Sequence, residues 1–411
     1  MKNYSLKIKM AFSGASLAFL LFLGACSSDE PATGGSTTVT APKIELTAPA
    51  SRAAAAVQDF NIDFFRNVAL YDDYKGKNVA CSPMSATMLL SLLSNAASDE
   101  TAAEIAAVLG YSDRNDLNEL YATLATKLPS LDSKATLSFA NSVWYHKEYT
   151  LTDNFSSIAK EYYKADIFKR DLSGKTIGVT DEINSWVNDN TNGLIKEVEV
   201  LLPTLSTLIN AAYFKADWKD KFKPENTDKA TFKGVAGDSQ IDMMHRTGSY
   251  LYERTEAYEA IEMPFGAGAF TAAFIMPSGD LEAFIDSDAL SGLWSNKPNA
   301  CNIDLSLPKF KIAEDEEINL TNILRDMGVK SLVNPGMMKL FNESPDADFF
   351  SVNQKTSVEF SEQGAEAASV TWTNSDISDG SISVSFDRPF VFMITEKSTK
   401  TILFAGKIMS L

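Results

Sequence analysis

The order of the periodic segments between residues 53 and 411 constrains the fold more than any other feature of this sequence. Apolar residues at helical spacing come early, in segments 53–70, 83–95, 101–109 and 180–187. Strand-like runs come later, in segments 208–214, 260–264, 270–276, 303–307, 390–394 and 401–408. Strands and helices do not alternate regularly, and no internal repeat or long linker divides this stretch. The pattern therefore predicts one α+β domain over residues 53–411.

Local signals mark two of the expected boundaries. Thr101 and Glu104 have the spacing of a capping box, which predicts a helix that begins there and ends at Gly110. Gly266 and Gly268 separate two strand-like runs and predict the turn of a hairpin. Both signals agree with helices in the early part of the domain and strands in the later part.

The first residues carry a sorting signal. Three lysines precede an almost uncharged apolar run over residues 10–23, which is typical of a secretory signal peptide and shorter than the roughly 20 residues of a membrane span. The following Leu23-Gly24-Ala25-Cys26 resembles the lipobox of bacterial lipoproteins, whose cysteine becomes the lipidated first residue. We therefore expect a signal peptide over 1–25, a lipid on Cys26 and a flexible tether over 26–52. This predicts an exported bacterial lipoprotein, anchored to a membrane at the periplasmic face or the cell surface.

Composition excludes several classes of function. A net charge of −17 argues against a nucleic-acid partner, because such partners need a positive surface. The two histidines, His146 and His245, leave little room for a metal site or a histidine relay, and we expect both to be packed or surface residues. There is no phosphate loop, nucleophile elbow or paired-cysteine metal motif, so we expect no metal, cofactor or catalytic residue. Cys81 and Cys301 are expected to be two separate buried thiols, although an exported protein permits a disulfide.

Residues 361–388 form an unusual segment between two strand-like runs, 356–360 and 382–386. The segment has no proline, and Arg388 is its first basic residue. At a period of two, one face carries only small residues, which are Ala365, Ala367, Ser369, Thr371, Thr373 and Ser375. A chain without proline leaves every amide free to pair with a neighbouring strand. The alternation fits a loop that enters a sheet with its small face inward, and a disordered loop with accidental alternation fits the composition equally well.

Several blocks in order along the chain resemble the serpin family over nearly the whole mature length. The similar blocks are 78–85, 97–110, 183–193, 210–218, 243–245, 305–310, 388–390 and 404–407. The resemblance implies a single-domain serpin fold, with early helices packed on three mostly antiparallel β-sheets and an exposed reactive loop. It also implies an inhibitor of serine proteases, not an enzyme, which acts as a monomer and forms a covalent 1:1 complex with its target.

The reactive loop of that family begins with a hinge, and Glu362-Gln363-Gly364-Ala365-Glu366-Ala367-Ala368 resembles it. The spacing from this hinge and the spacing to the downstream Pro389-Phe390 both place the reactive bond at Ser378-Asp379, with Ile377 as the alternative specificity residue. The resemblance implies that a protease attacks this bond and forms an acyl-enzyme. The cut loop then inserts as a new strand of the main sheet and traps the protease. The side chains facing inward on insertion would be the small ones at 365, 367, 369, 371, 373 and 375.

Five further residues match family positions where the main sheet opens. They are Ser82, Ser85, Asn210, Gln354 and Trp218. Trp218 corresponds to the tryptophan at the top of the opening. Gln354 stands where the family usually has histidine, and glutamine forms hydrogen bonds without becoming charged. This departure puts any pH dependence from that position in doubt.

The loop also bears on the target and on the competing hypotheses. Residues 363–387 contain no lysine or arginine, which argues against trypsin-like proteases, whereas a small Ser378 or Ile377 suits elastase-like or subtilisin-like enzymes.

A non-inhibitory serpin that acts as a surface binding protein is the alternative. A serine hydrolase is the third hypothesis, and its motif Ser157-x-x-Lys160 lacks the partner Lys-Thr-Gly. The change in heat stability on loop cleavage discriminates between the first two, and activity on an ester or peptide tests the third.

Overall fold

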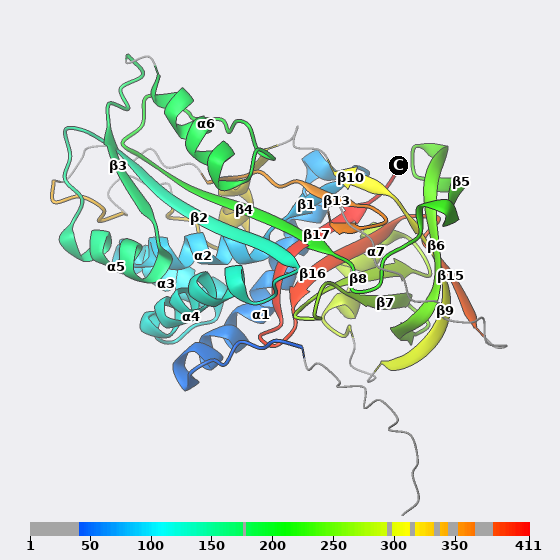
Figure 1. Ribbon diagram of the computed structural model, residues 1–411. Coiled ribbons are helices and arrows are strands. Elements are labelled where there is room, and N and C mark those ends of the chain that lie inside the picture. Colours follow the sequence, from blue (N-terminus) through cyan, green and yellow to red (C-terminus); the bar gives the residue numbers. More distant parts are fainter. Residues whose placement is uncertain are drawn as a thin grey trace, which may run out of the picture. The chain divides into compact units, whose positions relative to one another are not determined.

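A computed structural model describes residues 41–175, 178–293, 298–312, 317–332, 338–343, 352–365 and 381–411 (Figure 1). The α-helices in these ranges are α1 (Ala48–Leu70), α2 (Pro83–Ser94), α3 (Asp99–Leu109), α4 (Arg114–Lys127), α5 (Asp153–Tyr163), α6 (Val179–Asn190), α7 (Leu281–Asp286) and α8 (Leu320–Asp326). The short 3₁₀ helices are η1 (Asp72–Tyr74), η2 (Leu128–Ser130), η3 (Pro224–Asn226) and η4 (Asp288–Leu290).

The strands follow the order expected from the sequence, with most of them in the second half of the chain. They are β1 (Val79–Cys81), β2 (Ala135–His146), β3 (Asp166–Arg170), β4 (Ser206–Asp217), β5 (Thr227–Gly234), β6 (Gly237–Arg254), β7 (Tyr258–Pro264), β8 (Phe270–Pro277), β9 (Asn299–Pro308), β10 (Phe310–Ile312), β11 (Ile318–Asn319), β12 (Asn353–Gln354), β13 (Val358–Phe360), β14 (Gly364–Ala365), β15 (Ile382–Ser385), β16 (Phe390–Glu396) and β17 (Thr401–Ile408). The α+β class is confirmed.

Two expected boundaries are wrong. The first helix begins at Ala48, where the Thr47 side chain accepts a hydrogen bond from the Ala50 amide, so the expected tether over 26–52 overlaps the first turn of α1. The cap of α3 is Ser98, whose hydroxyl accepts from the Thr101 amide, and Glu104 instead accepts from the Ser331 amide at 2.8 Å. The predicted end of this helix is confirmed, since Gly110 adopts φ 73°.

The described residues form four hydrogen-bonded sheets, not the three that we expected. One sheet has nine strands in the order β1-β17-β16-β8-β7-β6-β9-β15, with β5 paired to β6. The 18-residue β6 pairs with β5, β7 and β9 along its length, so it joins strands that would otherwise form separate sheets. The others are a four-stranded sheet, β14-β4-β2-β3, and the short pairs β10-β13 and β11-β12. All pairs are antiparallel except β2-β3 and β15-β9.

The four-stranded sheet is covered on both faces. Neighbouring residues of a strand point to opposite faces. Val143 of β2 accordingly belongs to the main core, which includes much of α2, whereas Trp144 packs with Ile183 of α6 in a separate small cluster. Figure 1 shows α6 on one side of β2 and β4 and helices α2–α5 on the other. The sheet therefore has α6 as its outer cover.

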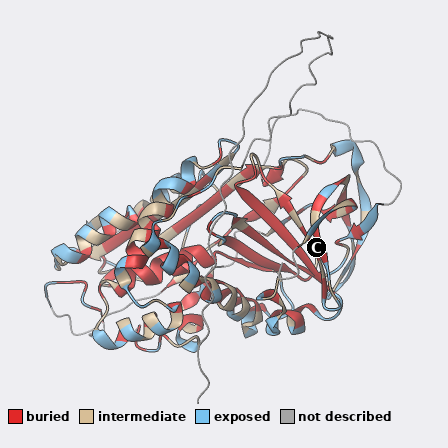
Figure 2. Ribbon diagram, turned by 90° about the horizontal axis from the view of Figure 1, so that it is seen from below, coloured by how far each residue is buried: buried red, intermediate tan, exposed pale blue. Residues whose placement is uncertain are grey.

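Buried residues concentrate on the central strands and the inner helix faces, as Figure 2 shows. In β9 the predicted alternation is confirmed, because Ile303, Leu305 and Leu307 are all fully buried. Cys81 is buried and Cys301 is half-buried, and both are free thiols, so only Cys81 fits the expectation of a buried group. Within the ranges that the structure describes, no helix is both long and apolar enough to cross a membrane.

Candidate functional site

The hinge residues lie at the end of β4. Ser361 and Gly364 form a tight turn in which each amide donates to the other's carbonyl, at 2.9 and 3.2 Å. The chain then pairs with β4 in an antiparallel ladder, with Gly364 opposite Asp217 and Ala365 opposite Ala216. Ala365 is only 3% exposed. The first inward-facing position of the expected inserted strand thus already occupies a strand position beside β4.

Trp218 holds this turn in place. Its backbone amide donates to the Gln363 carbonyl at 2.7 Å, and its indole Nε1 donates to the Ser361 carbonyl at 3.0 Å. The ring stacks on Phe265 with centroids 4.3 Å apart and also lies against Phe360. Because the ring is buried and both the backbone amide and the indole N–H of Trp218 donate to the turn, Trp218 fixes the path of the chain into the hinge.

Glu362 is held by groups that the sequence gave no reason to select. Its carboxylate accepts from Lys309 Nζ and from Thr227 Oγ1, each at 3.1 Å. Burial alone would raise the pKa of this carboxyl, but the hydrogen bonds and the Lys309 charge outweigh it and leave the pKa lowered. Next to it, Lys221 donates to Gln363 Oε1 at 2.9 Å. These partners lie far from the hinge in sequence, so only the folded chain reveals them.

Ser82, Ser85 and Gln354 meet as expected from the family positions. The Ser82 amide donates to Gln354 Oε1 at 2.8 Å, and Gln354 Nε2 donates back to the Ser82 carbonyl at 2.9 Å. Ser82 Oγ contacts Ser85 Oγ at 2.9 Å and lies 2.6 Å from the carbonyl oxygen of Leu403 in β17. This buried cluster connects the start of α2 to β12 and to the nine-stranded sheet.

Asn210 and Trp218 do not belong to that cluster. Asn210 Nδ2 donates to Asn141 Oδ1 across the β2-β4 ladder at 2.7 Å, while its own buried Oδ1 has no hydrogen-bond partner among the described residues. Trp218 follows the far end of the same strand, beside the hinge. The residues matched to the sheet-opening region thus lie in three places, which are the buried polar cluster at Ser82, the Asn210–Asn141 pair on β4 and β2, and Trp218 beside the hinge.

A narrow cavity of about 30 Å³, enough for about one water molecule, lies between β4 and β12. Residues 207–211 line one side of it, and Asn353, Lys355 and Glu317 line the other. Residues 194–203, which we call the strap, connect α6 towards β4, and Ile195, Val198 and Glu199 of the strap also line the cavity. The strap therefore borders the gap beside β4.

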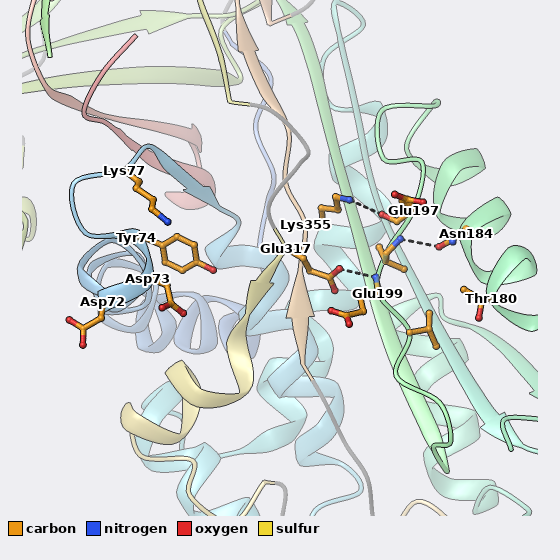
Figure 3. A pocket seen from close by; sticks show the side chains of 12 residues that line it. Asp72, Asp73, Tyr74, Lys77, Thr180, Asn184, Glu197, Glu199, Glu317 and Lys355 are labelled. Atoms are coloured by element: carbon orange, nitrogen blue, oxygen red, sulfur yellow. Dashed lines mark hydrogen bonds between the residues drawn. The ribbon is translucent and has the colours of Figure 1, made fainter. Parts of the chain in front are cut away.

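Three hydrogen bonds fix the strap (Figure 3). The Val198 amide donates to Asn184 Oδ1 of α6 at 2.9 Å. Lys355 Nζ donates to the Glu197 carbonyl at 2.9 Å, and the Glu199 amide donates to Glu317 Oε2 at 2.8 Å. The last two bonds come from the β12 side of the gap, so they tie the strap across it.

Several predicted residues lie outside the described part of the chain. They are Cys26, Glu366, Ala367, Ala368, Ser369, Thr371, Thr373, Ser375, Ile377, Ser378 and Asp379. The chain is described again from residue 381, and β15 pairs in parallel with β9 in the nine-stranded sheet. The two ends of the loop are thus attached to different sheets.

The Ser157-x-x-Lys160 motif and both histidines lie outside the hinge and the cluster at Ser82. Ser157 and Lys160 are both exposed on α5. His146 is packed beside Asp171, and His245 forms surface hydrogen bonds with Ser306 and Asp228. No group of three or more His, Cys, Asp or Glu residues in the described ranges has the arrangement of a metal site.

Comparison with known proteins agrees with this geometry. The chain is 29% identical over 381 residues to a serine protease inhibitor from Cyanea capillata, which covers 87% of this chain and 98% of the relative. Its fold matches the native state of the thermophilic serpin tengpin with a TM-score of 0.79 and 27% identity, over 87% of this chain and 94% of that one. Human thyroxine-binding globulin in complex with its hormone shares the fold, with a TM-score of 0.79 and 24% identity over 88% and 99% of the two chains.

The family model described as serpin (serine protease inhibitor) matches residues 55–411. That range contains the hinge, the polar cluster at Ser82, the strap and every described strand. Members of this family are generally inhibitors that form complexes with serine proteases. The chain therefore belongs to the serpin family.

Proposed function

We propose that this chain is a suicide inhibitor of elastase-like or subtilisin-like serine endopeptidases. In this proposal a target protease attacks the Ser378-Asp379 bond and becomes acylated. The freed loop then inserts beside β4 and carries the protease with it. Displacement of catalytic groups by about 1 Å can slow a reaction roughly 100-fold, so deacylation stalls and the complex persists.

The observation that carries the proposal is the register of the hinge on β4. Gly364 lies opposite Asp217 and Ala365 opposite Ala216, so an antiparallel ladder continued by one residue at a time would place residue 371 opposite Asn210. It would place residue 375 opposite Ser206, which is where β4 begins. The strand is therefore long enough to accept residues 364–375, the segment whose inward face carries only small side chains.

The energetics of insertion favour the same conclusion. About ten new ladder hydrogen bonds at roughly 0.5–1.5 kcal/mol each, together with burial, give an insertion free energy on the order of 10 kcal/mol. On the side of β14, β4 has no other strand partner among the described residues, so its edge can accept a strand. The unpartnered Oδ1 of Asn210 on this strand would also become accessible to the inserted chain.

Incubation with a protease panel tests the proposal. With elastase-like and subtilisin-like enzymes we expect a complex that survives boiling in SDS, and mass spectrometry of the released C-terminal fragment should show that it begins at Asp379. Trypsin-like enzymes serve as the negative control. A loop that is merely cut, with no complex and no rise in melting temperature, would contradict inhibition and favour a non-inhibitory surface binding protein.

We further propose that the chain is exported and anchored by a lipid on Cys26, and that it acts at a membrane surface of a bacterium. Support comes from the lysines and apolar run of residues 1–23 and from the Leu23-Gly24-Ala25-Cys26 sequence. Metabolic labelling with a radioactive fatty acid tests this. Label should be incorporated in the native sequence and lost in Cys26→Ala; equal labelling of both would contradict it.

A further inference from the structure

We propose that Glu317 is a pH-dependent positioning residue that ties the strap across the gap beside β4, so that its ionisation controls how readily the gap opens. This inference rests on the proposed function for its biological meaning, because the gap is where the cut loop would enter. The tie itself is a property of the folded chain and can be measured without any protease.

Glu317 is well placed to hold the strap. It directly precedes β11, and β11 pairs with β12, so its backbone is fixed on the side of the gap opposite β4. Its Oε2 accepts from the amide of Glu199, which lies in the middle of the strap. The Asn184 bond anchors the strap to its own helix, α6. Glu317 and Lys355 are therefore the groups that cross the gap to reach the strap among the described residues.

The surroundings of Glu317 make this tie sensitive to protonation. A cavity of about 1050 Å³ opens beside it, lined by the strap, by Thr180 and Asn184 of α6 and by the segment around η1 (Figure 3). The charged groups facing this cavity are Lys355, Glu197 and Glu199 near Glu317, and Asp72, Asp73 and Lys77 around η1. Protons and water can therefore reach a carboxyl that is itself half-buried.

Burial is the largest influence on the pKa of Glu317 and raises it, and the charge of Glu199 acts in the same direction. The Glu199 amide, Lys355 and the Asn353 side chain lower it but do not compensate fully, so the pKa is raised. A group whose pKa is raised in the closed state binds protons more tightly there than in an open, solvated state. Lowering the pH therefore stabilises the closed strap, and ionisation on raising the pH favours its release.

Because protonation of Glu317 stabilises the closed strap, two substitutions of this residue should have opposite effects. Glu317→Gln keeps the acceptor for the Glu199 amide and imitates the protonated carboxyl, so it should hold the strap more tightly at neutral pH. Glu317→Ala removes the acceptor and should release the strap at every pH. If Glu317 were only a structural hydrogen-bond partner, both substitutions would loosen the strap or leave it unchanged.

Hydrogen–deuterium exchange at the Glu199 amide measures the tie directly. Intrinsic rates cancel when variants are compared at the same pH, between about pH 5 and pH 8. We expect the amide in Glu317→Gln to exchange up to about tenfold more slowly than in the native sequence at the upper end of this range, the scale of one hydrogen bond. The two rates should converge towards the lower end. Glu317→Ala should exchange faster throughout.

The matched control is Glu225→Gln, which changes an exposed carboxylate on η3 that lies outside the cavity. In Glu225→Gln, the Glu199 amide should exchange at the same rate as in the native protein. Equal rates for the native sequence and Glu317→Gln at every pH, or faster exchange in Glu317→Gln, would overturn the proposal. Circular dichroism confirms that each variant is folded before it is compared.

A second measurement separates this inference from the proposed function. Part of the inhibitor should form an SDS-resistant complex, and the rest should be cut without forming one. In the native protein the fraction that forms the complex should fall at lower pH. In Glu317→Gln this fraction should be low at every pH. If exchange behaves as expected but no complex ever forms, the strap tie stands and the inhibitory function fails. If complexes form but exchange is insensitive to Glu317, the inhibitory function stands and the tie fails.

Discussion

Gly364 lies so close to Ala216 that no side chain fits between them. A Cβ at this position would stand 2.2 Å from the Ala216 carbonyl oxygen and 2.6 Å from the Trp218 amide nitrogen. Gly364 also has a φ of 137°, a backbone conformation that side-chain-bearing residues rarely adopt. The hinge can therefore approach β4 as it does only because residue 364 is glycine.

Gly364→Ala should lower the stability of the uncut protein. The clash and the positive φ together should cost about 1–3 kcal/mol, measured as a fall in the melting temperature. The matched control is Gly279→Ala, since that glycine has open space around its Cβ direction and no positive φ. The control should stay within about 0.5 kcal/mol of the native sequence. Equal melting of both variants would mean that the hinge does not depend on the close approach to β4.

Much of the fold could be read from the sequence because hydrophobic periodicity is local. The α+β class, the hairpin at Gly266 and Gly268 and the late strands are confirmed. The start of α1 was missed because Pro49 and the small polar residues before it are typical of a linker, although Thr47 and a proline in the first turn are also a helix start. Local composition alone does not discriminate between these two readings.

The candidate site was predicted where residues matched a family pattern, and the small face that begins at Ala365 was also visible as a period-two alternation. Glu362, Gly364 and Ala365 were selected from these two signals, but Lys309 and Glu317 were not, because their roles depend on contacts with residues far away in the sequence. The direct partner of Asn210 was not predicted for a related reason. Asn210 faces Asn141 through the register of β2 and β4, which a single sequence does not specify.

Gln354→His should create a pH dependence that the native sequence lacks at this position. Gln354 accepts from the Ser82 amide and donates to the Ser82 carbonyl inside a buried cluster. A neutral histidine can do both, but a protonated one cannot accept. Burial disfavours the charged ring and depresses its pKa when folded, so stability should be fully present above the unfolded value of about 6.5 and lost as the pH falls below it.

Melting temperatures of the native protein and of Gln354→His between about pH 5 and pH 8 check this prediction. The difference in melting temperature between Gln354→His and the native protein should grow steadily as the pH falls. Gln354→Glu is a useful comparison, because an ionised carboxylate cannot donate a hydrogen bond to the Ser82 carbonyl. This variant should therefore lose stability as the pH rises, in the direction opposite to Gln354→His. Parallel curves for all three would show that this cluster is not coupled to folding.

Glu282→Ala should be strongly destabilising. Lys407 of β17 has a fully buried side chain that donates to Glu282 of α7, and the Gly76 amide donates to the same carboxylate at 2.8 Å. Burial is the main cause of a lowered pKa for Lys407. Removal of Glu282 leaves this ammonium buried without its partner, which typically costs about 3–5 kcal/mol.

Thermal and denaturant unfolding of a double variant separates the charge from the packing. Glu282→Gln combined with Lys407→Met removes both charges while keeping similar volumes, and it should recover most of the loss seen in Glu282→Ala. If the double variant were as unstable as the single one, the pair would contribute through packing and not through its charges.

Under the proposed function, Ala365→Arg should turn the inhibitor into a substrate that is cut without trapping the protease. Ala365 is 3% exposed and occupies the first inward-facing position of the strand that insertion would extend. Because Ala365 already pairs with Ala216 before cleavage, an arginine there would either be buried without a partner, at a cost of several kcal/mol, or hold the hinge away from β4 and so oppose insertion. The reactive bond is distant in sequence and should still be cut. The control is Ser381→Arg, which adds the same charge at the exposed other end of the loop.

After incubation with an elastase-like protease, the native sequence and Ser381→Arg should form SDS-resistant complexes, and their cut forms should melt at a much higher temperature than the uncut forms. Ala365→Arg should yield cut protein alone, with its melting temperature unchanged. Because the substitution leaves the bait bond intact, cutting without trapping isolates insertion as the step that Ala365 serves. A stable complex with Ala365→Arg would show that insertion does not require a small side chain at this position.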